Sequence, residues 1–115
     1  MTMLTAIMVM LSIMLVLVMI PRIYGNWLQF RAYTEQGDTD QLAALQLLHN
    51  EWVLRHLALA VIALGFVAAI TYIPELAEYS QTAVAMAAYS AISFVLAFVE
   101  SLLAQKISSV TAPVR

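Results

Sequence analysis

The residues best suited to chemistry are a few ionisable side chains inside long apolar stretches. Glu100 is the one charged residue in the stretch 83–104, and Arg55 and His56 lie near the start of the stretch 53–73. A charge inside a membrane segment is costly, so such residues are functional candidates. We expect Glu100 to form an ion pair or hydrogen bond with Arg55 or His56. The alternative is that these three residues form a proton or ion relay.

Two histidines, His49 and His56, lie two helical turns apart on one face of the same predicted helix. Their backbones would be separated by about 10 Å of helical rise. Zinc sites generally use closer spacing and more ligands. We therefore predict no metal site and no cofactor within one chain. A haem, quinone or pigment held between subunits is left open.

The motifs of the common catalytic sites are absent from the sequence. There is no GxSxG or HExxH pattern, no cysteine, and with three glycines in 115 residues there is no phosphate-binding glycine-rich loop. The net charge of −2 carries no basic excess that could neutralise nucleic-acid phosphates. We predict no catalytic residue and no nucleic-acid partner.

The composition indicates a membrane protein. Hydrophobic residues make up 63% of the chain and charged residues 10%, against about 45–50% and about 25% in soluble domains. Three apolar stretches, 3–20, 53–73 and 83–104, match the roughly 20 residues that a membrane helix needs. Backbone amides cannot remain unpaired in hydrocarbon, so each stretch must be helical. We predict an all-α integral membrane protein, a single domain over residues 1–115 with three transmembrane helices.

The orientation follows from the basic residues. They all fall on one side if the N-terminus is outside and the C-terminus inside, as the positive-inside rule requires; they are Arg22, Arg31, Arg55, Lys106 and Arg115. The opposite loop carries Glu75 and Glu78 and no base. The first stretch has no basic n-region and no small-x-small cleavage site, so we expect a retained helix. A bacterial plasma membrane is the simplest location.

The segment 21–52 is the only sizeable part expected outside the membrane. Its aromatic residues suit the headgroup region as an interfacial helical extension of the first helix, to about residue 33, or as a docking surface for a partner; they are Tyr24, Trp27, Phe30, Tyr33 and Trp52. Gly37 predicts a helix end, and Asp38 with Gln41 resembles a capping box. We expect a loop and helix over 34–52 that can continue unbroken into the second span.

Small residues predict how the spans pack, because membrane helices associate through close backbone approach. Three sets have four-residue spacing: Gly65 and Ala69; Ala83, Ala87 and Ala91; Ser93, Ala97 and Ser101. We expect these sets to hold the second and third spans together as a hairpin, or in part to face another subunit. The first span instead carries an apolar stripe of Met3, Ile7, Met10, Met14 and Leu17, for which lipid and protein contact both remain open.

Taken together, these features favour a non-catalytic small subunit or scaffold of a larger integral membrane complex. Its expected partners are membrane lipids and other integral membrane subunits or copies of itself. One alternative is a self-assembling, holin-like pore-former. Another is a small membrane enzyme acting on a lipid or thiol substrate at the cytoplasmic interface. That enzyme would need the side chains of His49, Asn50, Glu51, Arg55 and Glu100 to converge between subunits.

Overall fold

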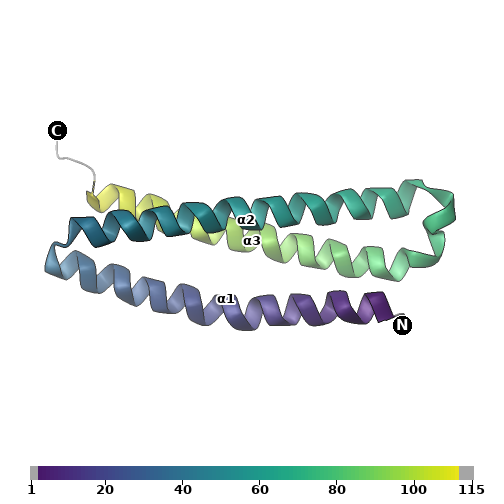
Figure 1. The fold of residues 1–115 in the computed structure, drawn as a ribbon, viewed down its shortest axis with the longest axis horizontal. Coiled ribbons are helices and arrows are strands. Elements are labelled where there is room, and N and C mark those ends of the chain that lie inside the picture. The colour runs from purple at the N-terminus through teal and green to yellow at the C-terminus, as the bar shows by residue number, and fades with distance from the viewer. Residues whose placement is uncertain (1–2, 112–115) are drawn as a thin grey trace.

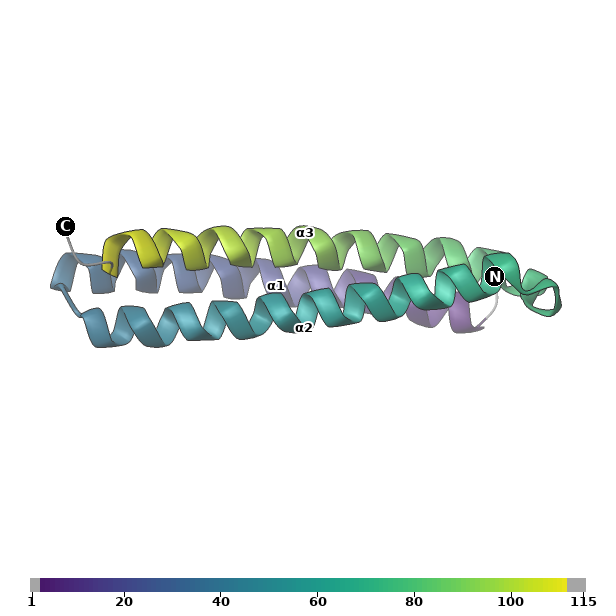
Figure 2. The same cartoon turned by 90° about the horizontal axis from the view of Figure 1, so that it is seen from above.

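Three long helices lie side by side in the computed structural model, which describes residues 3–111 (Figures 1 and 2). They are α1 (Met3–Gln36), α2 (Thr39–Tyr72) and α3 (Ser80–Thr111), with a 3-10 helix η1 (Pro74–Tyr79) between α2 and α3. α2 runs antiparallel to α1 and α3 (Figure 1). All three are long and apolar enough to cross a membrane. The prediction of an all-α protein with three such helices is confirmed.

The turn between α1 and α2 is built by the residues that the sequence indicated. Gly37 has φ +67°, the left-handed conformation that glycine adopts without steric cost. Asp38 then caps α2, because its side chain accepts a hydrogen bond of 3.2 Å from the Gln41 backbone N–H. α1 continues through Pro21 to Gln36, and α2 runs unbroken to Tyr72. The aromatic segment 24–33 therefore lies in the C-terminal part of the long helix α1.

Four hydrogen bonds made by side chains fix the register of the helices, three of them to other side chains and one to a backbone carbonyl. Thr5 and Thr82 share a 2.8 Å bond between their hydroxyl oxygens, and Arg22 contacts Glu100, so α1 and α3 run parallel at one offset. Ser90 donates to the Ala60 carbonyl at 2.9 Å and His49 contacts Glu100, which sets the antiparallel α2–α3 pair. All three helices thus meet along one common axis.

Buried residues recur every seven positions on each helix. They are Thr5, Ser12, Met19 and Asn26 on α1; Leu42, His49, His56 and Ala63 on α2; and Ala83, Ser90, Ala97 and Ala104 on α3. A seven-residue repeat is the pattern of helices that pack with a small crossing angle, as in a coiled coil. We call these buried heptad positions the seam. Several seam residues are polar or small, whereas the equivalent positions of a soluble helical bundle are mostly large and apolar.

The apolar stripe of the first span lies on the outside. Met3, Met10 and Leu17 are all exposed, while Thr5 and Ser12 are buried. Lipid is as apolar as these side chains, so α1 gains little by burying them, whereas a polar side chain gains a partner by facing inward. The sequence left open whether the stripe contacts lipid or protein. Within one chain it faces outward, away from the other two helices.

The predicted small-residue sets are buried only in part. Ala83, Ser93 and Ala97 are buried, and Ala69 and Ser101 are half-buried, as expected. Gly65, Ala87 and Ala91 are exposed, and no atom lies within 4 Å of a Cβ added at Gly65. Ala87 lines a groove between α2 and α3, and Ala91 lines a groove between α1 and α3. Contact of Gly65 with another subunit, the alternative given above, stays a prediction. Buried positions on α3 alternate between three and four residues apart, which keeps them on one face of the helix. Residues that are always four apart rotate progressively away from that face.

Candidate functional site

A buried charge cluster takes one residue from each helix. The Glu100 carboxylate on α3 accepts a hydrogen bond from Arg22 Nη2 on α1 through Oε1, and its Oε2 is hydrogen-bonded to His49 Nδ1 on α2. The side chain of Glu100 is 0% exposed and that of His49 is 1% exposed. One carboxylate therefore ties the three helices together at a single level of the bundle.

The hydrogen bonds of Glu100 go to Arg22 and His49, and none is formed with the expected partners Arg55 and His56 within the described residues. Arg55 is exposed, with its guanidinium 5.1 Å from the Trp52 ring centroid, and His56 forms no hydrogen bond with any described residue. His49 takes the place of His56 because it lies one heptad earlier, at the level of Glu100 in the antiparallel register. Arg22 was not expected as a partner of Glu100 because it lies just beyond the first apolar stretch, 3–20, in the part of α1 placed outside the membrane.

An aromatic side chain links this cluster to the second histidine. The Arg22 guanidinium lies 4.3 Å from the Trp52 ring centroid, within the range of a cation–π contact. On the same helix the Trp52 and His56 ring centroids are 5.5 Å apart. The half-buried Trp52, predicted as a docking residue, therefore packs inside the bundle between Arg22 and His56.

His56 and Ser93 form a second polar level. Each lies seven residues from a member of the Glu100 cluster on antiparallel helices, so they face each other across the α2–α3 seam. Both are buried, and neither ring nitrogen of His56 nor Oγ of Ser93 has a hydrogen-bond partner within residues 3–111. Buried groups left unpaired in this way lower stability.

The depth of the cluster follows from helix length. Glu100 lies about 30 Å along α3 from Ser80 at 1.5 Å per residue, close to the thickness of a bilayer hydrocarbon core. A bilayer whose outer boundary is at Ser80 would place the Glu100 cluster at the opposite boundary. The ends of the helices beyond the cluster would then project past the hydrocarbon.

The end of the bundle between the Glu100 cluster and the α1–α2 turn has its own apolar core. Phe30, Leu42, Leu45 and Ile107 are buried together, with Trp27 and Tyr33 packed against them. Tyr24 is 63% exposed. The predicted aromatic stripe divides in this way because three-residue steps turn by about 300° each, so Tyr24 and Tyr33 point in opposite directions.

The cluster connects all three helices. Both oxygens of Glu100 are occupied. Asn50, Glu51 and Arg55 are exposed on α2, away from the buried His49, so the proposed enzyme residues do not converge within one chain. Among residues 3–111 no group of three or more His, Cys, Asp or Glu side chains is placed to hold a metal ion.

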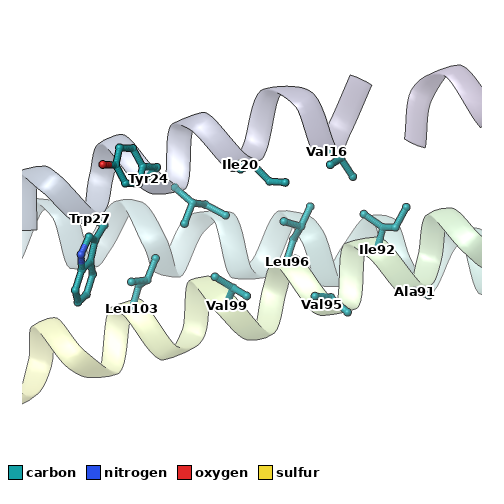
Figure 3. A pocket seen from close by; sticks show the side chains of 11 residues that line it. Val16, Ile20, Tyr24, Trp27, Ala91, Ile92, Val95, Leu96, Val99 and Leu103 are labelled. Carbon is teal, nitrogen blue, oxygen red and sulfur yellow. The ribbon is translucent and has the colours of Figure 1, made fainter. Parts of the chain in front are cut away.

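An apolar groove of about 700 Å³ lies between α1 and α3 (Figure 3). It is lined by Val16, Ile20, Ile23, Tyr24, Trp27, Ala91, Ile92, Val95, Leu96, Val99 and Leu103. Two of the predicted aromatic residues, Tyr24 and Trp27, lie together at one end of it (Figure 3). This groove is the second candidate site.

None of the family models, curated proteins or solved structures compared with this chain matches it. The structure itself defines its class, an all-α protein with three helices long and apolar enough to span a membrane.

Proposed function

We propose that this protein is a non-catalytic small subunit or scaffold of a larger integral membrane complex. The observation that carries the proposal is the use of the buried charges. Glu100 is hydrogen-bonded to Arg22 and His49 across three helices, and its side chain is 0% exposed, so the cluster is closed to a substrate unless the helices move. The cluster gives a small bundle a defined register at about the depth where the helices leave the hydrocarbon.

The outer surface supports a role in assembly. Gly65 on α2 and Ala87 on α3 are exposed, so a neighbouring helix could approach closely at either position. We infer that partner helices from other subunits, alone or together with copies of this chain, pack on this surface. The chain would then be a rigid connector whose outer surface selects the partner helices.

We further propose the orientation with the N-terminus outside and the turn at Gly37 inside the cell, in a bacterial plasma membrane. It is supported by Arg31 and Lys106, which lie in the parts of α1 and α3 nearest the turn at Gly37, and by Arg22 and Arg55 near the middle of α1 and α2, while Glu75 and Glu78 lie in η1 at the other end.

The experiment is the native mass of the affinity-purified protein in nanodiscs, with every co-purifying chain identified. The expected result is one or more other membrane polypeptides in fixed ratio. A closed homo-oligomer alone would contradict the subunit proposal. The Gly65→Leu variant should lose the partners, whereas Gly25→Leu, a matched substitution toward the other end of the bundle, should retain them.

A holin-like pore is the second candidate, and the polar seam favours it. Thr5, Ser12, Ser90, Ser93 and His56 all face the bundle axis, so helices rearranged around a wider axis would present these groups to water. The test is release of a trapped dye from liposomes containing the protein. Release with a steep dependence on protein density would favour the pore, and retained dye would exclude it.

A further inference from the structure

The groove between α1 and α3 has a local cause in the sequence. Pro21 lies in the interior of α1, where its ring crowds the preceding turn and its missing N–H removes one helical hydrogen bond. A proline is a common origin of helix bending. α1 bows away from the α2–α3 hairpin (Figure 1), and the groove is lined by Val16, Ile20, Ile23 and Tyr24 on both sides of Pro21.

The groove is apolar along its length and polar only at one end. Between Val16 and Val99 it is lined by aliphatic side chains, and at the end nearest the α1–α2 turn lie Tyr24 and Trp27 (Figure 3). Tyrosine and tryptophan combine an apolar ring with a hydrogen-bond donor, which suits the level of lipid headgroups. A volume of about 700 Å³ lies within the range of small-molecule sites.

A positive charge stands at the same end. Lys106 Nζ on α3 lies 5.8 Å from the Trp27 ring centroid, and Lys106 is exposed. Within residues 3–111 no carboxylate forms a salt bridge with Lys106, because the only such pairs are those of Glu100. The ammonium group, which lies over the Trp27 ring at this end of the groove, is therefore available to an external anion.

The depth of these residues agrees with a headgroup. Lys106 lies about 9 Å beyond Glu100 along α3, and the headgroup layer extends several ångströms beyond the hydrocarbon boundary. The apolar part of the groove then lies at acyl-chain depth. Basic sites between helices on the cytoplasmic side are a known setting for anionic headgroups.

We propose that this groove binds one anionic phospholipid. An acyl chain lies between α1 and α3 against Ile20, Ile92 and Val99, and the phosphate contacts Lys106, Trp27 and Tyr24. The inference is independent of whether the protein is a subunit or a pore, since it concerns a single chain.

The test is native mass spectrometry of the delipidated full-length protein titrated with dioleoyl phosphatidylglycerol or with dioleoyl phosphatidylcholine. One phosphatidylglycerol is expected to bind in preference to phosphatidylcholine. Lys106→Gln should weaken phosphatidylglycerol binding about fivefold, the effect of one basic residue near an anionic lipid. Arg31→Gln removes an equal charge from an exposed position on α1 that, unlike Lys106, has no ring contact with Trp27, and it should leave this binding unchanged.

Two further measurements separate the contribution of the acyl chain to binding from that of the headgroup. Val99→Trp should fill the groove and abolish binding of the long-chain lipid, with the helical circular dichroism spectrum showing that the fold is kept. Dihexanoyl phosphatidylglycerol and inorganic phosphate lack the long chain and should fail to displace the dioleoyl lipid. Equal binding of the two dioleoyl lipids by the unmodified protein, equal effects of Lys106→Gln and Arg31→Gln, or a dimer that excludes lipid would overturn the proposal.

Discussion

At the scale of single residues, the energetics of this protein depend on how buried polar groups are paired. Glu100 is fully buried, and hydrogen bonds to Arg22 and His49 offset the cost of removing its charge from water. His56 is equally buried but has no such bonds within the described residues. Two histidines on one helix face should therefore respond differently to the same substitution.

Replacing the central carboxylate should be strongly destabilising. In Glu100→Gln the Arg22 charge loses its counter-ion, and we expect a loss of about 3 kcal/mol in the free energy of unfolding. Unfolding of the protein in mixed micelles, titrated with sodium dodecyl sulfate, measures it. The matched control is Glu51→Gln, an exposed acid on α2 that should change stability little.

A double variant completes this test. Arg22→Gln combined with Glu100→Gln removes both charges, so its loss should be smaller than the sum of the two single losses. Strictly additive losses would show that the two charges do not interact in the folded protein.

The two histidines should differ in the sign of their effect. His56→Leu removes two unpaired buried nitrogens and should raise the free energy of unfolding by about 1 kcal/mol. His49→Leu leaves Oε2 of Glu100 unpaired and should lower it. The same titration measures both variants. A loss of stability in His56→Leu as large as in His49→Leu would mean that His56 has a bonding partner in the folded protein.

At the scale of helices, packing follows the small and polar residues of the seam. Ala97 is 2% exposed between α2 and α3, at a heptad position shared with Ser90 and Ala104. Gly65 was predicted from its spacing to be equivalent, but it faces outward. The two positions therefore separate internal packing from external contact.

Enlarging the seam residue should disrupt the hairpin. Ala97→Leu forces three extra carbons into a close helix interface and should destabilise the bundle by about 1–3 kcal/mol. Gly65→Leu should leave the stability of the isolated chain nearly unchanged, because no atom lies within 4 Å of an added Cβ. Thermal unfolding followed by circular dichroism measures both variants, and equal destabilisation would contradict the observed register.

At the scale of the whole molecule, the two ends differ in their basic residues and in packing. The end at Gly37 carries Arg31 and Lys106 together with acidic residues near the turn, and a buried apolar cluster of Phe30, Leu42, Leu45 and Ile107. The other end carries η1 with Glu75 and Glu78, and no residue of η1 is buried. This asymmetry underlies the proposed orientation.

The native chain contains no cysteine, so single cysteines can report its orientation. Glu78→Cys should react with a membrane-impermeant maleimide in intact cells. Asp40→Cys, at the exposed start of α2, should react only after the membrane is permeabilised. The reverse pattern of labelling would overturn the proposed topology.

The sequence by itself determined the features that depend on local chemistry. Apolar length and the need to pair backbone amides required three helices, and Gly37 with Asp38 set the turn and cap between α1 and α2. Glu100 was identified as the key buried charge because an acid in an apolar span must be compensated. Each of these conclusions depends on residues close together in the chain.

Only the tertiary structure decided which residues meet. The partners of Glu100 come from helices more than fifty residues away, and a shift of one heptad exchanges His49 for His56 without changing any local pattern. Hydrophobic patterning could not orient α1, because lipid and protein interior are equally apolar and Thr5 and Ser12 are the only polar residues in its apolar stretch, 3–20. The physical reason is that helix register in a membrane is set by a few polar contacts and close approaches, and these exist only once the helices are assembled.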